Sequence, residues 1–566
     1  MWRTVGRCLS VLLLLSGLSG PLQAIDSVEV HLQLLLKAGA EGKLPAAEHL
    51  EWADLHALYE RADWQLLWSY PDGEPRARMQ QALGQWIGRA VQHGLDPADY
   101  QYGRLQQPFA DSMTMSPDPV LNDLLMSQSF MWLAQDLAGV RPSPRKHDRL
   151  WRFPPRKLDV IELLLHTSVT GQMDDALQTL LPRAAEYWRL SEHYATLLQA
   201  HETEVWPVPN LDMTGLLRPG ERHPVVPRLR AALIHRGLLA VAAAADRGPE
   251  LTGVYAPELV AAVKAFQREQ GLEPDGILGP DTRSALQRSP EQILQQLRAN
   301  LQRWRWLPRD LGERYLLVRT GAYAMTLVEQ EQAVEQYRII SGRPHRPTLS
   351  FGSDLDYVIL NPPWTVPFRL AVEDLLPRQQ KDGSYLARHQ IEVLELVDGR
   401  WQVVASDSIN WAELSRRHFP YLLRQRPGPF NSLGRIRFGM ANPYSIYLHD
   451  TPQQTLFEPS ERAFSSGCIR VDGIEELAQR LLGERQLAPV LESLKTRHLR
   501  LDRPLPVYLV YLTVWVDEQN QAHYHPDVYG LDGVLQQALG PVPEWPRIYV
   551  DPAGLARKEP RPVVND

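Results

Sequence analysis

A histidine and a cysteine separated by 18 residues are the side chains of this sequence best suited to nucleophilic chemistry. His449 ends a run that predicts a strand, and Cys468 follows the tight-turn segment Ser465-Ser-Gly467. A thiol with an ordinary pKa of about 8.5 is mostly protonated at neutral pH, and a neighbouring imidazole would remove its proton. Backbone N–H groups of a glycine-containing turn can stabilise an oxyanion. If the fold brings His449 and Cys468 together, the pair predicts acyl transfer through the cysteine.

Cysteine usage leaves other interpretations of Cys468 to weigh. The chain has 2 cysteines, and Cys8 lies in a predicted signal, so the mature chain keeps one thiol and no internal disulfide. A lone cysteine is often a small buried hydrophobe. A zinc site at His449 and Cys468 lacks a second cysteine, and His523 and His525 lack a third ligand. No metal site and no cofactor are therefore predicted.

The N-terminus predicts export. Residues 1–24 combine Arg3 and Arg7 with an apolar run of about ten residues and a small residue at the exit, the pattern of a secretory signal. The run is shorter than the ~20 residues that a membrane span needs, although an uncleaved anchor is the alternative. A net charge of −7, without a Lys/Arg-rich block, argues against nucleic-acid binding. A bacterial-type periplasm is the expected location.

The length of 566 residues predicts several domains, of overall class multidomain α+β. Residues 25–215 carry apolar side chains at three- and four-residue spacing and predict a helical scaffold. Residues 291–540 contain short runs of β-branched and aromatic residues and predict a mostly β domain. A charged, irregular stretch at about 370–430 is expected to be a capping insertion, and 541–566 an extended tail.

A separate small module is expected at residues 216–290. Val226–Gly237 and Glu258–Gly271 predict two helices, and Pro280 opens a short third one. The phrase A-V-x-x-F-Q-x-x-x-G-L-x-x-D-G-x-x-G-x-x-T closely resembles the peptidoglycan-binding domain of cell-wall enzymes. The resemblance implies a three-helix module that binds the wall, without naming its contacts.

The catalytic segment resembles the YkuD-type domain of L,D-transpeptidases through H-(18 residues)-C and S-x-G-C-I-R. The longer periplasmic subfamily, with a scaffold and a peptidoglycan-binding domain, is similar over nearly the whole mature chain. By that resemblance Cys468 is the nucleophile and His449 the catalytic histidine. Oxyanion donors would be the N–H groups of Ser466, Gly467 and Cys468, and the imidazole would be oriented by the carbonyl of Asp450.

Two flanking residues, Tyr447 and Arg470, are candidates for substrate binding, and a packing role is equally open for both. Arg470 suits anionic stem carboxylates because a guanidinium offers a bidentate fork. Trp364 is expected to be core more than substrate contact. Many members of the family have histidine where this chain has Ser466, so the role of that second histidine does not transfer.

The implied reaction acts on peptidoglycan stem peptides as donor and acceptor. Cys468 would expel the terminal D-Ala of a tetrapeptide stem, and an amine of a second stem would then form a 3→3 cross-link. Water as acceptor would give an L,D-carboxypeptidase, and a lipoprotein lysine would give protein anchoring. A non-catalytic wall-binding scaffold is a further alternative, against which the intact His449 and Cys468 argue.

Overall fold

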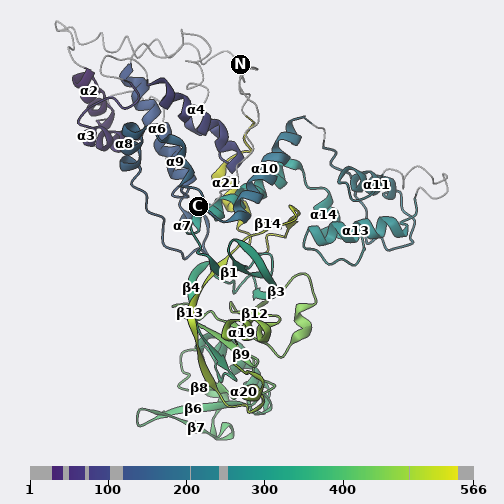
Figure 1. Cartoon of the computed structure of the whole chain (residues 1–566). Coiled ribbons are helices and arrows are strands. Elements are labelled where there is room, and N and C mark those ends of the chain that lie inside the picture. Colours follow the sequence, from purple (N-terminus) through teal and green to yellow (C-terminus); the bar gives the residue numbers. More distant parts are fainter. Residues whose placement is uncertain are drawn as a thin grey trace.

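The computed structural model describes residues 28–41, 50–69, 76–101, 119–203, 206–240, 253–483 and 485–545. The predicted signal at 1–24, with Cys8, lies outside these residues, as does the tail beyond residue 545. Within the described ranges, no helix combines the length and apolarity needed to cross a membrane. A helical region, a small helical module to its side and an elongated β domain below them make up the chain (Figure 1).

The helical region confirms the periodicity read from the sequence. Its helices are α2 (Val28–Ala40), α3 (Trp52–Arg61), α4 (Ala77–Ala90), η2 (Val91–His93), η3 (Pro97–Tyr100), α6 (Pro119–Leu137), α7 (Pro144–His147), α8 (Val160–Thr170), α9 (Met173–Gln178) and α10 (Ala185–Thr203). Helix α6 is buried along most of its length and forms the centre. Its Asp123 is fully buried and accepts hydrogen bonds from Tyr59 and from the N–H groups of Leu67 and Trp68. A buried carboxylate needs such donors.

Packing does not follow the domain boundary expected at residue 291. Helix α15 (Pro290–Trp306) lies in the hydrophobic core of the scaffold, together with strand β14 (Val514–Val516) and helix α21 (Asp532–Leu539). Arg298 of α15 donates to the carbonyls of Leu539 and Pro541, so the described start of the tail also packs on the scaffold. The scaffold is therefore assembled from separate chain segments, because the hydrophobic face of α15 is complementary to α10.

A buried ion pair joins these segments. Arg303 of α15 contacts Asp532 at 2.5 Å, and Asp532 also accepts from the Thr513 hydroxyl at 2.7 Å. Asp532→Ala leaves the buried guanidinium without its counter-ion, so we expect the free energy of unfolding to fall by about 3–5 kcal/mol. Urea unfolding of the full chain measures this. The exposed pair of Asp502 with Arg485 is the control, because Asp502→Ala should change stability by ~0–1 kcal/mol. Equal effects would contradict the prediction.

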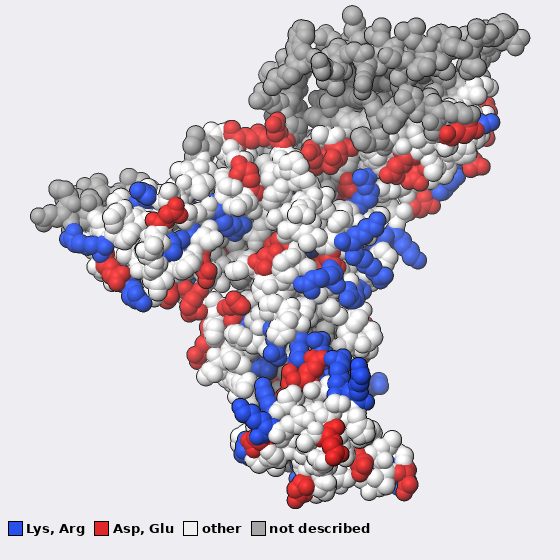
Figure 2. Space-filling model, turned by 180° about the vertical axis from the view of Figure 1, so that it is seen from behind, with Lys and Arg blue, Asp and Glu red and all other residues white. Residues whose placement is uncertain are grey.

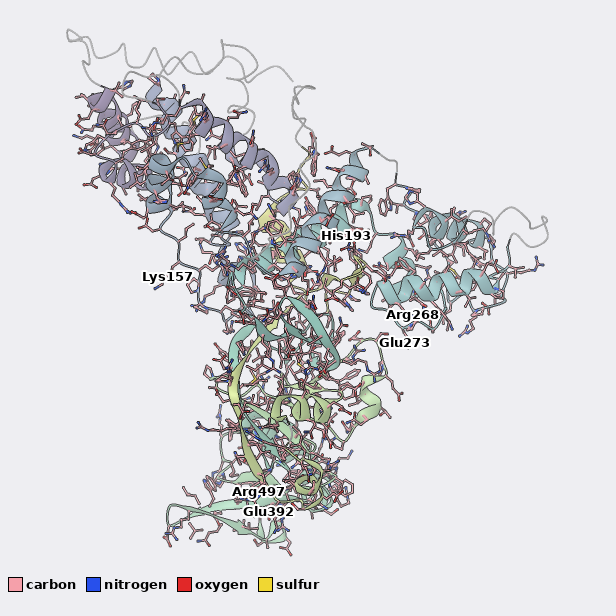
Figure 3. All side chains as sticks on the ribbon, in the orientation of Figure 1. Lys157, His193, Arg268, Glu273, Glu392 and Arg497 are labelled. Carbon is pink, nitrogen blue, oxygen red and sulfur yellow. The ribbon has the colours of Figure 1, made fainter. Side chains whose placement is uncertain are left out.

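The side module has the expected helices, α11 (Val226–His235), α13 (Pro257–Glu269) and α14 (Pro280–Leu286), around a core of its own. Gln267 of α13 accepts from the N–H of Gly276 at 2.9 Å, which fixes the turn after the helix. The module contacts the β domain, where the Ser460 N–H donates to Glu273 at 3.0 Å. Figure 3 places Glu273 at the edge of the module nearest the β domain.

The β domain is built on one large sheet, with strand order β11-β3-β12-β10-β9-β4-β13-β1-β2 among the described residues. Its strands are β1 (Arg314–Arg319), β2 (Ala324–Glu329), β3 (Gln332–Gly342), β4 (Phe351–Leu360), β9 (Ile436–Met440), β10 (Leu448–His449), β11 (Ala463–Ser465), β12 (Ile469–Val471) and β13 (Arg497–Val510). Strand β2 also pairs with β3, so the sheet closes on itself like a barrel. Helix α19 (Ile474–Leu482) packs into the same core as the strands.

The insertion is more ordered than the sequence suggested. It contains a second sheet of order β5-β8-β6-β7, from β5 (Trp364–Thr365), β6 (Ile391–Val397), β7 (Arg400–Val404) and β8 (Leu422–Gln425). Short helical segments complete it, namely α16 (Phe368–Leu370), η5 (Ala371–Leu375), α17 (Leu376–Lys381) and α18 (Tyr385–Arg388). Its core is separate from that of the large sheet. We call residues 364–425 the cap.

The prediction of an irregular stretch was wrong, because the few apolar residues of the cap are spread over short elements that bury them together. Val393 of β6 and Leu423 of β8 lie in its core, and each of these short strands also carries a charged residue that is not buried. Figure 1 shows the cap sheet at the end of the β domain farthest from the scaffold. Figure 2 shows basic side chains gathered on the lower scaffold and the β domain, despite the acidic overall charge.

Candidate active site

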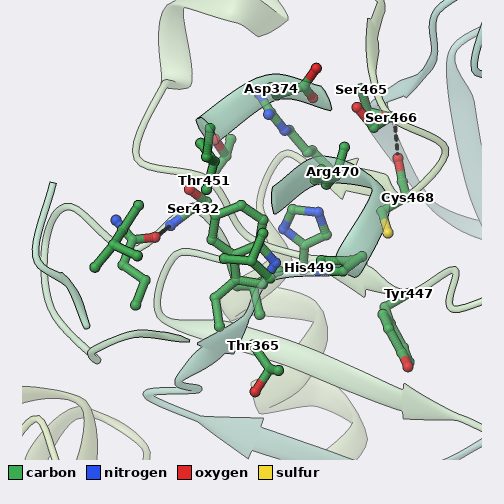
Figure 4. Close-up of a pocket in the computed structure, with 18 of the residues that line it drawn as sticks. Thr365, Asp374, Ser432, Tyr447, His449, Thr451, Ser465, Ser466, Cys468 and Arg470 are labelled. Carbon is green, nitrogen blue, oxygen red and sulfur yellow. Dashed lines mark hydrogen bonds between the residues drawn. The ribbon is translucent and has the colours of Figure 1, made fainter. Parts of the chain in front are cut away.

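Strand pairing brings His449 and Cys468 together. Strand β10 runs parallel to β12, with Leu448 opposite Ile469 and His449 opposite Arg470. Leu448 and Ile469 are fully buried in the barrel core. Because successive side chains of a strand point to opposite faces, His449 and Cys468 both point away from that core. They line one cavity, in which Figure 4 shows them as neighbours.

The turn before Cys468 is held by hydrogen bonds of its own. The Ser465 hydroxyl donates to the Cys468 carbonyl at 2.6 Å, and the Thr348 hydroxyl donates to the Gly467 carbonyl at 2.9 Å. Gly467 has φ of 117°, a region that L side chains rarely adopt, which accounts for the glycine. We define residues 465–468 as the Cys468 turn.

One of the three expected oxyanion donors is engaged elsewhere. The Gly467 N–H donates to the Ser465 hydroxyl oxygen at 3.0 Å, so in this structure it does not face the cavity as a vacant donor. The expectation for Gly467 is corrected here, because the serine side chain satisfies the turn internally. The N–H groups of Ser466 and Cys468 have no acceptor among the described residues and are the two that remain for an oxyanion.

The imidazole of His449 is buried and oriented by the main chain. Its Nδ1 lies 2.5 Å from the Asp450 carbonyl oxygen. A carbonyl only accepts, so Nδ1 carries the proton and Nε2 keeps its lone pair. The Asp450 carboxylate is fixed by the N–H groups of Arg435 and Thr451, at 2.8 and 2.7 Å. The backbone that carries the orienting carbonyl is therefore itself anchored.

Two arginines stand beside the pair in adjacent strands. His449 is opposite Arg437 of β9 on one side and Arg470 of β12 on the other. Burial, then Arg470 and Arg437, lowers the pKa of His449 to about 3. Burial raises the pKa of the Cys468 thiol, opposed by the Tyr447 N–H and both arginines. At neutral pH the pair is therefore a neutral thiol beside a neutral imidazole, which is the form in which His449 can accept a proton.

The cavity around the pair has a volume of about 1090 Å³ and a strongly cationic wall. Asp374 is the one carboxylate among the described residues that line it. The arginines of the lining are Arg343, Arg346, Arg369, Arg378, Arg437 and Arg470. Figure 4 shows His449, Cys468 and Arg470 around the cavity, with Asp374 and Thr365 of the cap at opposite edges. Such a wall fits an anionic ligand with carboxylates.

The structure clarifies the candidate binding residues. Tyr447 lines the cavity, and the Arg437 guanidinium lies 4.3 Å from the centre of its ring. Arg470 donates to Gln453 at 3.3 Å and also lines the cavity. Trp364 both packs against the cap core and lines the cavity, so its expected core role holds only in part. No group of three or more His, Cys, Asp or Glu in the described chain is arranged to hold a metal ion.

Sequence reasoning did not single out Arg437. It sits in the run Arg435-Ile-Arg-Phe-Gly439, in which buried Ile436 and Phe438 alternate with arginines. That alternation was a usable sign that Arg437 leaves the core on the opposite face. The sequence could not show that this strand lies next to His449.

The pH dependence of thiol reactivity should respond to Arg437. Arg437→Gln removes a cation that favours the thiolate, so we expect the pKa of Cys468 to rise by roughly one more pH unit. Alkylation of Cys468 at neutral pH would then slow about tenfold. The rate of iodoacetamide labelling, followed by mass spectrometry between pH 6 and 11, measures this. Arg497→Gln, in an exposed residue of β13 (Figure 3), should leave the profile unchanged. A lower thiol pKa in Arg437→Gln would refute the prediction.

Comparisons with known proteins agree with this geometry. Residues 53–193 match a family model described as "Scaffold domain", 222–286 one described as "Putative peptidoglycan binding domain", and 313–499 one described as "L,D-transpeptidase catalytic domain". A curated relative from Haemophilus influenzae, "Putative L,D-transpeptidase", is 37% identical over 251 residues. The match covers 44% of this chain and 50% of the relative, so the chain spans about half the length of that relative.

A solved structure also matches in part. The crystal structure of the L,D-transpeptidase from Xylanimonas cellulosilytica is 15% identical and covers 53% of this chain and 99% of its own. Its TM-score of 0.17 is too low to establish a shared fold by itself. By the family models, residues 313–499 match the YkuD-type L,D-transpeptidase catalytic domain, and the same chain matches a scaffold domain and a peptidoglycan-binding domain.

Proposed function

We propose that the chain is a peptidoglycan L,D-transpeptidase that uses Cys468 as nucleophile and His449 as general base to form 3→3 cross-links. The observation that carries the proposal is the parallel pairing of β10 with β12, which puts both side chains at one cationic cavity. The match of residues 313–499 to the catalytic domain supports the reaction class.

The first step forms a thioester. Nε2 of His449 takes the thiol proton while Cys468 Sγ attacks the carbonyl carbon of the third stem residue. The N–H groups of Ser466 and Cys468 donate to the resulting oxyanion. Collapse of this intermediate breaks the amide bond, and the imidazolium returns the proton to the leaving amine of the terminal D-Ala. The positive charge that appears on His449 is transient, which is consistent with its lowered pKa.

The second step transfers the acyl group to an amine. The side-chain amine of a second stem attacks the thioester carbon and loses a proton to His449. The C–S bond then breaks, and His449 returns this proton to Cys468 Sγ, which regenerates the thiol. Arg437 and Arg470 stand next to the reacting pair and would bind stem carboxylates. The role of Asp450 is to hold His449 through its carbonyl.

The cavity is large enough for a stem peptide. Its volume of about 1090 Å³ lies at the upper end of the range for pockets that hold one drug-sized ligand, about 300–1,000 Å³. We take an amine as the acceptor, and product analysis distinguishes it from water. The domain at 222–286 would hold the enzyme on its polymer, and a substrate in the wall agrees with the expected periplasmic location.

The decisive experiment is product analysis with tetrapeptide muropeptides as substrate. We expect cross-linked dimers and released D-Ala with the wild-type chain and neither product with Cys468→Ala. Tripeptide monomers alone would identify an L,D-carboxypeptidase instead. Unchanged substrate in both samples, with retained binding to wall fragments, would favour the non-catalytic scaffold and refute the proposal.

A further inference from the structure

Arg346 bridges the cap and the Cys468 turn. It lies in the loop that follows β3, and only 9% of its side chain is exposed. Its Nη1 donates to the Asp374 carboxylate at 2.5 Å and to the Ser466 hydroxyl at 3.2 Å. Its Nη2 donates to Asp374 and to Glu373, both at 2.9 Å. One buried guanidinium thus reaches two carboxylates of η5 in the cap and one hydroxyl beside Cys468.

A second arginine, Arg343, also binds the turn at Ser465 and Ser466. Arg343 donates through Nη2 to the Ser466 hydroxyl at 2.8 Å and through Nε to the Ser465 carbonyl at 3.2 Å. Its N–H donates to the same carbonyl at 3.0 Å. Ser466 is two residues from Cys468 and supplies one of the two N–H groups left for the oxyanion. The hydrogen bonds to Ser466 thus hold a residue that is close in the chain to Cys468 and carries a candidate oxyanion donor.

The contact of Arg346 with Asp374 in the cap differs from an ordinary surface ion pair. Asp374 lines the cavity, and Arg346 holds the pKa of Asp374 below its usual range. Residues 371–375 form a π-helical turn, an irregularity that often marks functional sites. Glu373 has further partners in the exposed arginines Arg369 and Arg416, at 2.9 and 2.7 Å. Arg369 and Arg416 both lie within the cap and have no hydrogen bond with Ser466, whereas Arg346 lies outside the cap and joins it to Ser466.

We propose that Arg346 is a positioning residue that couples the docking of the cap, through Asp374, to the geometry of Ser466 and Cys468. The Arg346 guanidinium can bind the Asp374 carboxylate and the Ser466 hydroxyl together only when the cap lies against the turn. The turn therefore adopts its active geometry when the cap is in this position. The proposal rests on the proposed transpeptidase function, and assigns Arg346 a role through other residues and not through contact with the reacting atoms.

Two measurements on full-length variants test this role. Arg346→Gln should lower kcat about ten- to hundred-fold, the range expected for a lost charged hydrogen bond, with KM within about twofold of wild type. Loosening of the turn should also expose Cys468 to solvent and bring its pKa down toward the ordinary value, because burial is what raises it. Iodoacetamide labelling against pH reads out that pKa without needing turnover.

The matched control is Arg416→Gln, which removes an exposed ion pair to Glu373 and leaves Ser466 untouched. It should leave kcat and the labelling profile at wild-type values. A double-mutant cycle of Arg346→Gln with Ser466→Ala should be non-additive in kcat, because the two act through one hydrogen bond. If Arg346→Gln loses its cooperative unfolding transition, Asp374→Asn and Ser466→Ala carry the same test.

The proposal fails if Arg346→Gln keeps wild-type kcat and labelling, if Arg416→Gln has the same effects, or if the cycle with Ser466→Ala is additive. These results can be distinguished from a failure of the proposed transpeptidase function. A wild-type chain without cross-linking activity would still show, by its labelling profile, whether Arg346 sets the environment of Cys468.

Discussion

Cys468→Ser should abolish turnover of tetrapeptide muropeptides, with a loss in kcat of ~10⁴-fold or more. A serine hydroxyl is far less acidic than a thiol, and His449, with its pKa lowered to about 3, is a weak base. The wild-type pair can work because a thiol, even with its pKa raised by burial, is more acidic than a hydroxyl and is the stronger nucleophile. The side chain is replaced by one of similar size, so the turn should keep its hydrogen bonds, which run through Ser465 and Thr348.

The same variant should bind isolated wall fragments as the wild type does. The module at 222–286 has its own hydrophobic core, and Cys468 takes no part in the hydrogen bond of Ser460 with Glu273 that joins the module to the β domain. Co-sedimentation measures this binding. A carbapenem should add one drug-sized mass to the wild type and none to Cys468→Ala. Retained turnover in Cys468→Ser would overturn the assignment of the nucleophile.

His449→Gln is expected to cost ~10²–10⁴-fold in kcat at neutral pH, the range for loss of a general base. The glutamine amide cannot accept the thiol proton, although it can occupy the space of the ring. Because the variant lacks only the base that removes the thiol proton, raising the pH above the pKa of Cys468 should restore much of the rate of the first, thioester-forming step. Acylation by a carbapenem, followed by mass spectrometry against pH, measures that recovery.

A control separates the base from the packing role of the ring. Iodoacetamide labelling of Cys468 at high pH needs no base, so His449→Gln and wild type should there react at equal rates. A variant that is slow at every pH would indicate a distorted turn. Near wild-type turnover at neutral pH would exclude His449 as the base.

Much of the local architecture followed from sequence patterns. Periodicity predicted α6 and the helices of the module, and Gly94 ends its helix with φ of 72°, as a helix-terminating glycine does. The short strands expected between residues 291 and 540 are also observed, for example β1 (Arg314–Arg319). These features depend on neighbours within a few residues, which is the range over which propensity and capping act.

Other expectations failed where the structure depends on packing between segments that are far apart in the chain. Helix α15 was placed with the β domain, yet its apolar face packs against α10, about 100 residues earlier in the chain. The cap was expected to be irregular, although Val393 and Leu423 are buried together in it. Both outcomes depend on which elements pack against each other. Hydrophobic periodicity predicts a helix or a strand but does not identify the element against which it packs.

The site divides in the same way. The sequence alone singled out His449 and Cys468 as the candidate pair, because their residue types and the turn motif suit acyl transfer, and the structure places both at one cavity. The register that sets His449 between Arg437 and Arg470, the capture of the Gly467 N–H by Ser465, and the reach of Arg346 to both Asp374 and Ser466 came only from the tertiary structure. Strand order and side-chain geometry arise from contacts between residues far apart in the chain, and those contacts leave no mark in local sequence.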